Sequence, residues 1–118
     1  MSNDNLILAE LNENDFTAVP NYFLNNFSIE ISPTEFVIMI CLLRHAQYES
    51  LNAKLIVKMS LNKMSECAGL AKNTIVTNLE KLLQKQYIFR IKHVVSNNEH
   101  QTNKYIINTG KLFGVQDE

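Results

Sequence analysis

The sequence predicts a mainly α-helical domain with a small β-sheet, and three observations support this prediction. Residues 60–83 contain two sets of apolar residues at helical spacing, with a glycine between them. Residues 87–95 are rich in β-branched and aromatic types, and a second short run of this kind follows at 104–108. Upstream, residues 36–43 are all apolar. Helices followed by a β-hairpin are therefore expected.

The two helices of residues 60–83 are marked at their ends. Ser60 precedes the first helix, where its hydroxyl can accept a hydrogen bond from a first-turn amide. Gly69 follows that helix, and a sharp turn there favours the positive φ that glycine adopts without a Cβ clash. The second helix is expected over residues 72–86. The apolar side chains of the pair are Leu61, Met64, Ala68, Leu70, Ile75, Leu79, Leu82 and Leu83.

A supporting helix is predicted to begin at residue 33. Ser32 stands at the N-cap, Pro33 at the first helical position and Glu35 three residues after the cap. The apolar run at 36–43 should be buried nearly all round, in the core or partly in a subunit interface. Ahead of it, residues 16–27 predict an extended entry and then a short helix.

A third strand at 55–57 completes the predicted elements. A three-helix core plus a C-terminal β-hairpin wing is a winged helix-turn-helix. We expect this domain over residues 16–109, with an acidic N-terminal arm at 1–15 and a C-terminal tail at 110–118. A chain of 118 residues can bury one core and leaves no room for a separate catalytic domain.

The net charge of −1 conceals an uneven distribution. Residues 1–35 carry six acidic residues and no Lys or Arg, a net charge of −6. Residues 51–111 carry ten basic residues against three acidic ones, a net charge of +7. The part that contains the helix pair and the wing is therefore cationic, which favours an anionic partner.

Other classes of function have weaker support. Cys41 and Cys67 lie in predicted helices without metal-ligand spacing, so we expect reduced core residues, no metal site and no cofactor. His45, His93 and His100 are isolated, without a catalytic constellation, so an enzyme is not expected. The sequence has no signal sequence and no apolar segment that could span a membrane, so a cytoplasmic location without membrane binding is expected.

The polar face of the second helix carries side chains that suit a DNA groove. Asparagine can bond adenine bidentately, threonine suits a thymine methyl, and lysine reaches phosphate or guanine. The alternative is an ordinary solvated face, but this face has one acid at its edge, Glu80, and lacks alternating Glu and Lys pairs. The residues on it are Asn73, Thr74, Thr77, Lys81 and Gln84, with Asn78 at the flank.

Five segments together resemble the winged-helix domain of phage and plasmid replication proteins, including DnaD-like N-terminal domains and related small regulators. They are Val19-Pro-Asn-Tyr-Phe, Ile31-Ser-Pro-Thr-Glu-Phe, Ser60-Leu-Asn-Lys-Met-Ser-Glu, Gly69-Leu-Ala-Lys-Asn-Thr and Leu79-Glu-Lys-Leu-Leu. The resemblance implies base reading by the residues that open the second helix and backbone or minor-groove contacts from the hairpin loop. The implied residues are Lys72, Asn73, Thr74, Thr77 and Asn78 in the helix and Asn97, Asn98 and His100 in the wing. Ala71 departs from the family pattern, where a serine usually caps this helix.

Roles follow for the candidate DNA-binding residues. Asn73, Thr74 and Thr77 are candidate base readers, and Asn78 is a flanking contact. Ser60 and Asn62 can present backbone amides to a phosphate. The candidate phosphate contacts are Lys63, Lys72, Lys81, Arg90, Lys92 and Lys104.

The predicted function is double-stranded DNA binding, in transcription regulation or as a phage or plasmid replication accessory factor. The helix at 72–86 would read the major groove, and the wing at 88–108 would contact backbone or minor groove. A homodimer is expected, through the apolar helix at 36–43 or the segment at 6–11, because one winged helix reads few base pairs. The alternative is a docking module that binds replication or transcription proteins and has no DNA binding of its own.

Overall fold

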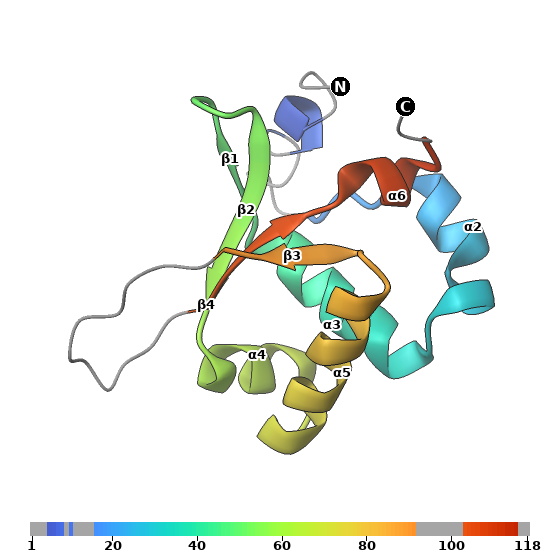
Figure 1. Ribbon diagram of the computed structural model, residues 1–118, viewed down its shortest axis with the longest axis vertical. Helices are drawn as coiled ribbons and strands as arrows, with labels where there is room; N and C mark the ends of the chain where they lie inside the picture. Colours follow the sequence, from blue (N-terminus) through green and yellow to red (C-terminus); the bar gives the residue numbers. More distant parts are fainter. Residues whose placement is uncertain (1–4, 9, 11–15, 92–102, 116–118) are drawn as a thin grey trace.

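The computed structural model describes residues 5–8, 10, 16–91 and 103–115, and it shows a mainly helical domain with a small antiparallel sheet of four strands. The helices are α2 (Asn21–Glu30), α3 (Pro33–Arg44), α4 (Leu61–Ala68), α5 (Lys72–Gln84) and α6 (Thr109–Phe113). The strands are β1 (Gln47–Glu49), β2 (Lys54–Met59), β3 (Ile88–Arg90) and β4 (Asn103–Ile107). In Figure 1, α4 and α5 lie at the bottom of the molecule, and α2 and α6 pack together at the right. The predicted combination of helices and a small sheet is confirmed.

Helix α3 begins where the sequence predicts. The Glu35 N–H donates to the Ser32 hydroxyl at 3.2 Å, and the Ser32 N–H donates to the Glu35 carboxylate at 2.8 Å. Most of the apolar run at 36–43 is buried in the core of this chain, and Val37 is its exposed member. Helix α3 is therefore the central helix of the fold, and it offers little surface to a second subunit.

The helix pair also begins and turns as predicted. The Lys63 N–H donates to the Ser60 hydroxyl at 3.1 Å, and Gly69 ends α4 with φ of 69°. Helix α5 ends at Gln84 rather than at residue 86. Gln86 has φ of 65°, and the N–H groups of Gln86 and Tyr87 donate to the last turn of α5, which closes the helix and turns the chain into β3.

The sheet has the strand order β1-β2-β4-β3, with every neighbouring pair antiparallel. Strand β2 confirms the strand predicted at 55–57, and β4 confirms the one predicted at 104–108. Strand β1 was not predicted. Strand β3 is confirmed over its three residues, and residues 92–95 of the same predicted strand lie outside the described residues. The buried side chains on the inner face are Leu55, Val57, Met59, Tyr105 and Ile107.

Both ends of the chain include parts that pack on this domain. The described residues 5–8 are helical, with Leu8 in the core and Asn5 donating to the Ala53 carbonyl at 3.0 Å. At the other end, the predicted tail contains α6, whose Leu112 is fully buried. Helix α6 packs against α2. Described segments of the predicted arm and tail thus belong to the same core.

A buried carboxylate joins α3 to the end of α5. Glu35 is 2% exposed, and the Lys85 ammonium donates to its two oxygens at 3.0 and 3.2 Å. Lys85 also donates to the Glu30 carbonyl at 2.8 Å. Burial alone would raise the pKa of Glu35, but the hydrogen bonds from Ser32 and Lys85 outweigh it and hold the pKa below its usual value.

Candidate nucleic-acid interface

The outward face of α5 carries a row of exposed hydrogen-bonding side chains. Asn73, Thr77 and Lys81 recur at helical spacing, so they lie on one side of the helix, and all three are exposed. Lys72 at the start and Gln84 at the end of α5 are exposed as well. The opposite side packs into the core through Ile75, Leu79 and Leu82. The structure therefore brings most of the predicted α5 residues together on one accessible surface.

Asn78 does not occupy the predicted flanking position. Its side chain is 8% exposed, and its amide donates to the Thr74 carbonyl at 2.7 Å. A side chain that donates to the carbonyl one turn earlier lies along its own helix and is not directed at a base. Asn78 is thus corrected to a buried residue. Thr74, a predicted base reader, is half-buried and offers only part of its side chain.

Val76 is a member of the same outward surface that the sequence analysis missed. It is 43% exposed and lies between the predicted polar residues of α5. An apolar side chain can contact a thymine methyl in the major groove. Its helical spacing from Asn73 and Lys72 is the signal in the sequence that places Val76 on this face.

The first turns of α4 and α5 differ in how their amides are satisfied. Ser60 is half-buried and caps α4 through the Lys63 N–H, while the side chains of Asn62 and Lys63 are exposed. Ala71 makes no side-chain cap bond to α5, as expected from its methyl group. First-turn amides of α5 are therefore open to an anion such as a phosphate.

Arg90 is held by neighbouring side chains. Its guanidinium donates to the Glu80 carboxylate at 3.2 Å, and it lies over the Tyr105 ring at 5.9 Å from the ring centroid. Both side chains of the ion pair are about half exposed, so the pair is a weak surface interaction that a phosphate can replace. Arg90 is therefore accessible, although Glu80 already partners it.

The wing residues divide between the described strands and the residues beyond them. Lys92, Asn97, Asn98 and His100 lie outside the described residues. Lys104 lies on β4 directly opposite Lys58 of β2 and is half-buried. Lys58 and Lys54 are exposed lysines of β2 that the sequence analysis did not select. Both lysines stand at even-numbered positions of β2, on the face opposite the buried Leu55, Val57 and Met59, and this spacing was the available signal.

The lysines of this region lack partners among the described acidic side chains. The described ion pairs join Lys85 to Glu35, Arg90 to Glu80 and Lys111 to Glu30. Lysines outside these pairs keep a net positive charge that is available to an external anion. These lysines are Lys54, which lies directly opposite Glu49 of β1 without a described ion pair, and Lys58, Lys63, Lys72, Lys81 and Lys104.

His45 is less isolated than the sequence suggested. The Cys67 Sγ lies 3.9 Å from His45 Nε2, and Cys41 is buried on α3 one turn before His45. Burial, aided by Arg44 and Lys63, lowers the pKa of His45, and burial raises the pKa of the Cys41 thiol to about 12. Within the described ranges, three or more metal-ligating groups do not gather at any point. This cluster is packed between α3 and α4 and lines neither of two grooves of the molecule, one between α2 and α6 and one beside the sheet.

Those two grooves lie away from α5. The larger, of about 470 Å³, runs between α2 and α6, and its charged residues Glu30 and Lys111 face each other at 3.7 Å. The other, of about 300 Å³, borders the outer side of the sheet. Among the described helices, none has the length and apolar character needed to cross a bilayer.

Comparisons of this chain with protein-family models, with curated proteins and with solved structures find no match.

Proposed function

We propose that this protein binds double-stranded DNA as a winged helix-turn-helix. The element order supports the proposal, because α4 and α5 are joined by a tight glycine turn and followed by the antiparallel pair β3 and β4. Helix α5 would enter the major groove, and the β3–β4 hairpin would contact the backbone or the minor groove. The protein would serve transcription regulation or act as a phage or plasmid replication accessory factor.

The exposed row on α5 is the observation that carries this proposal. Asn73 and Thr77 are base-reading types on the accessible face of a helix whose other face is in the core. Lys72 and Lys81 lie on the same helix without described acidic partners, so they are free to contact phosphates and position it.

Binding as a homodimer to a palindromic site is part of the proposal, because a single reading helix contacts few base pairs. Most apolar side chains of α3 are buried in the core of this chain, and so is Leu8 of the N-terminal segment. A dimer would therefore use other surfaces. Apolar residues exposed on α2, such as Leu24 and Ile29, are available for this purpose.

The test is duplex binding by the full chain across a range of salt concentrations, after selection of bound sequences from a random duplex pool. A DNA-binding protein shows a slope of log K against log salt of about −0.9 for each phosphate contacted. Asn73→Ala should lower the affinity for the selected sequence, and the matched control Asn52→Ala, at an exposed position in the turn between β1 and β2, should leave the affinity unchanged. Absence of duplex binding at low salt would exclude the proposal.

A docking module is the second candidate. It is favoured by Val76 and Glu80, an exposed apolar and an exposed acidic side chain on the same face of α5. A docking module would show little duplex binding at any salt concentration. In such a module, Val76→Asp would lower the affinity for the protein partner. In a DNA-binding protein, neutralising Glu80 would strengthen duplex binding by removing a charge that repels phosphate.

A further inference from the structure

The outer face of the sheet carries an apolar row that crosses three strands. The register places Ile56 of β2 opposite Ile106 of β4, and Ile106 opposite Phe89 of β3. The neighbours Leu55, Val57, Tyr105, Ile107 and Ile88 are buried on the core side, so these three side chains point to the other side, where Ile56 is 9% exposed. Phe89 is 42% exposed, and Ile106 is half-buried. The row ends in an accessible aromatic ring.

Lysines flank this row on both sides. Lys54 precedes Ile56 by two residues, and Lys58 follows it by two, so all three share the outer face. Lys58 is directly opposite Lys104. Two residues along a strand span about 6.6 Å. The Cα atoms of the flanking lysines therefore lie at roughly that distance from the apolar row.

Lys58 and Lys104 form a pair of like charges on the outer face. Like charges directly opposite in a sheet are destabilising, and neither lysine has an ion-pair partner among the described acids. A bound anion would remove this repulsion. The arrangement is thus suited to a ligand that brings negative charge to the lysines and flat apolar surface to the row.

We propose that this outer face binds single-stranded nucleic acid, with a base stacked on Phe89 and the sugar-phosphate backbone along Lys54, Lys58 and Lys104. Aromatic stacking beside a cationic track is the usual means of holding single strands. A duplex hides the faces of its bases and would leave Phe89 and Ile106 without a partner, so the single strand fits this surface better. A groove of about 300 Å³, lined by Lys54, Phe89 and Ile106, gives the strand a recess between the sheet and α6.

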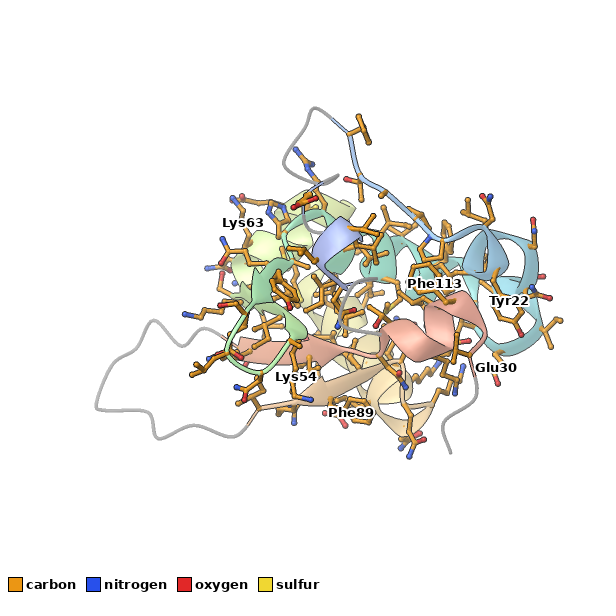
Figure 2. The ribbon with its side chains drawn as sticks, turned by 90° about the horizontal axis from the view of Figure 1, so that it is seen from above. Tyr22, Glu30, Lys54, Lys63, Phe89 and Phe113 are labelled. Atoms are coloured by element: carbon orange, nitrogen blue, oxygen red, sulfur yellow. The ribbon has the colours of Figure 1, made fainter. Side chains whose placement is uncertain are left out.

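This surface is separate from the start of α4. Lys54 and Phe89 lie at the lower edge of the molecule in Figure 2, and Lys63 lies at the opposite side. The inference rests on the proposed function in that both assign a nucleic-acid partner, but it uses residues that the duplex proposal does not require, apart from Lys104. The two proposals can therefore fail separately.

The experiment measures fluorescence anisotropy of a labelled oligothymidylate and of a labelled duplex with the full chain. We expect the oligothymidylate to bind at low salt. Phe89→Ala should lower the affinity for the oligothymidylate at least about fivefold, which is the lower end of what one stacked base contributes. The double variant Lys58→Gln/Lys104→Gln should reduce the salt slope by about 1.4, because single strands lose about 0.7 per phosphate contact.

Two controls separate stacking from general effects. Phe89→Leu keeps apolar bulk but removes the ring, so it should weaken the oligothymidylate as Phe89→Ala does while leaving the thermal melting curve unchanged. Lys81→Gln on α5 should lower the affinity for the duplex and leave the affinity for the oligothymidylate unchanged. Phe89 and Lys58 are exposed, so these variants should fold.

Several outcomes would overturn the inference. Duplex binding without oligothymidylate binding would remove this surface and leave the proposed function in place. If Phe89→Ala leaves the oligothymidylate affinity unchanged and polyglutamate binds equally well, the surface binds any polyanion or an acidic peptide, and the inference is wrong. Oligothymidylate binding that depends on Phe89, without duplex binding, would support this inference and refute the duplex proposal.

Discussion

The ion pair between Glu35 and Lys85 allows a prediction whose magnitude follows from the structure. Lys85→Met removes the ammonium that lies 3.0 Å from the Glu35 carboxylate, whose side chain is only 3% exposed. The carboxylate then keeps the Ser32 N–H at 2.8 Å but loses its counterion. Breaking a buried pair in this way costs about 3–5 kcal/mol. Because the Lys85 side chain is 35% exposed, we expect about 2–4 kcal/mol.

Glu35→Gln should cost less, about 1–2 kcal/mol. Glutamine preserves the capping box and leaves no buried charge, so the main loss is one charge-assisted hydrogen bond to Lys85. The two single variants and the double variant form a cycle whose coupling energy measures the pair. The matched control is Lys81→Met, an exposed lysine on the same helix, which should change the unfolding free energy by less than about 0.5 kcal/mol.

The assay is urea unfolding, repeated as a function of pH. The folded-state pKa of Glu35 is lowered, so its contribution is complete above the unfolded pKa, about 4.3, and is lost as the pH falls through the folded value. The stability difference between wild type and Glu35→Gln should therefore be largest near neutral pH and shrink below about pH 4. A Lys85→Met variant as stable as Lys81→Met would refute the assigned role of this pair, and so would a difference that grows in acid.

Other predictions test the helix pair and the sheet. Asn73→Ala should lose roughly 1–3 kcal/mol on the selected duplex and relax preference at one position, whereas Lys81→Ala should weaken all sequences alike; equal losses on selected and random duplexes for both would contradict these roles. Asn78→Ala should leave duplex affinity within about twofold, because its amide is bonded to the Thr74 carbonyl. Lys104→Glu should raise the unfolding free energy by roughly 0.2–1 kcal/mol, seen in urea melts, by replacing a like-charge pair with an opposite one. Gly69→Ala should destabilise by about 1 kcal/mol, because φ of 69° is strained for alanine although nothing obstructs its Cβ.

The parts of the fold that the sequence predicts well are those with local signals. The caps of α3 and α4 depend on hydrogen bonds that span three residues, between Ser32 and Glu35 and between Ser60 and Lys63. Such bonds depend only on residue types at a fixed short spacing, so both partners of each cap can be identified from the sequence.

Strand β1 and helix α6 depend on distant partners. Strand β1 has three residues and exists by pairing with β2. Helix α6 did leave a signal that the analysis passed over, since Asn108 caps it through the Lys111 N–H and Gly114 ends it with φ of 74°. A five-residue helix lacks the apolar periodicity that makes longer helices visible, and it is held by the burial of Leu112.

The candidate interface was predictable on α5 and only partly elsewhere. A helical wheel separates Asn73 and Thr77 from the core side, but it cannot show that the Asn78 amide turns back to the Thr74 carbonyl. On β2, Ile56 interrupts the alternation and makes residues 55–57 resemble a strand buried on both faces. Only the register shows that Ile56 lies in one row with Ile106 and Phe89 on the outer face.

The described ion pairs also explain how a chain of net charge −1 can present a cationic surface. Glu30 and Glu35 belong to the acidic N-terminal third, and both are bound within the fold, to Lys111 and Lys85 respectively. Those two acids therefore neutralise the cations that hold α2, α3, α5 and α6 together, and they do not face the lysines of α4, α5, β2 and β4. Because a charge acts on a ligand by its distance and not by its share of the total, these two acids do not offset the lysines of α4, α5, β2 and β4. Exchanging Lys85 for a neutral residue should therefore lower stability, whereas exchanging Lys81 should lower affinity for duplex DNA and exchanging Lys58 should lower affinity for a single strand.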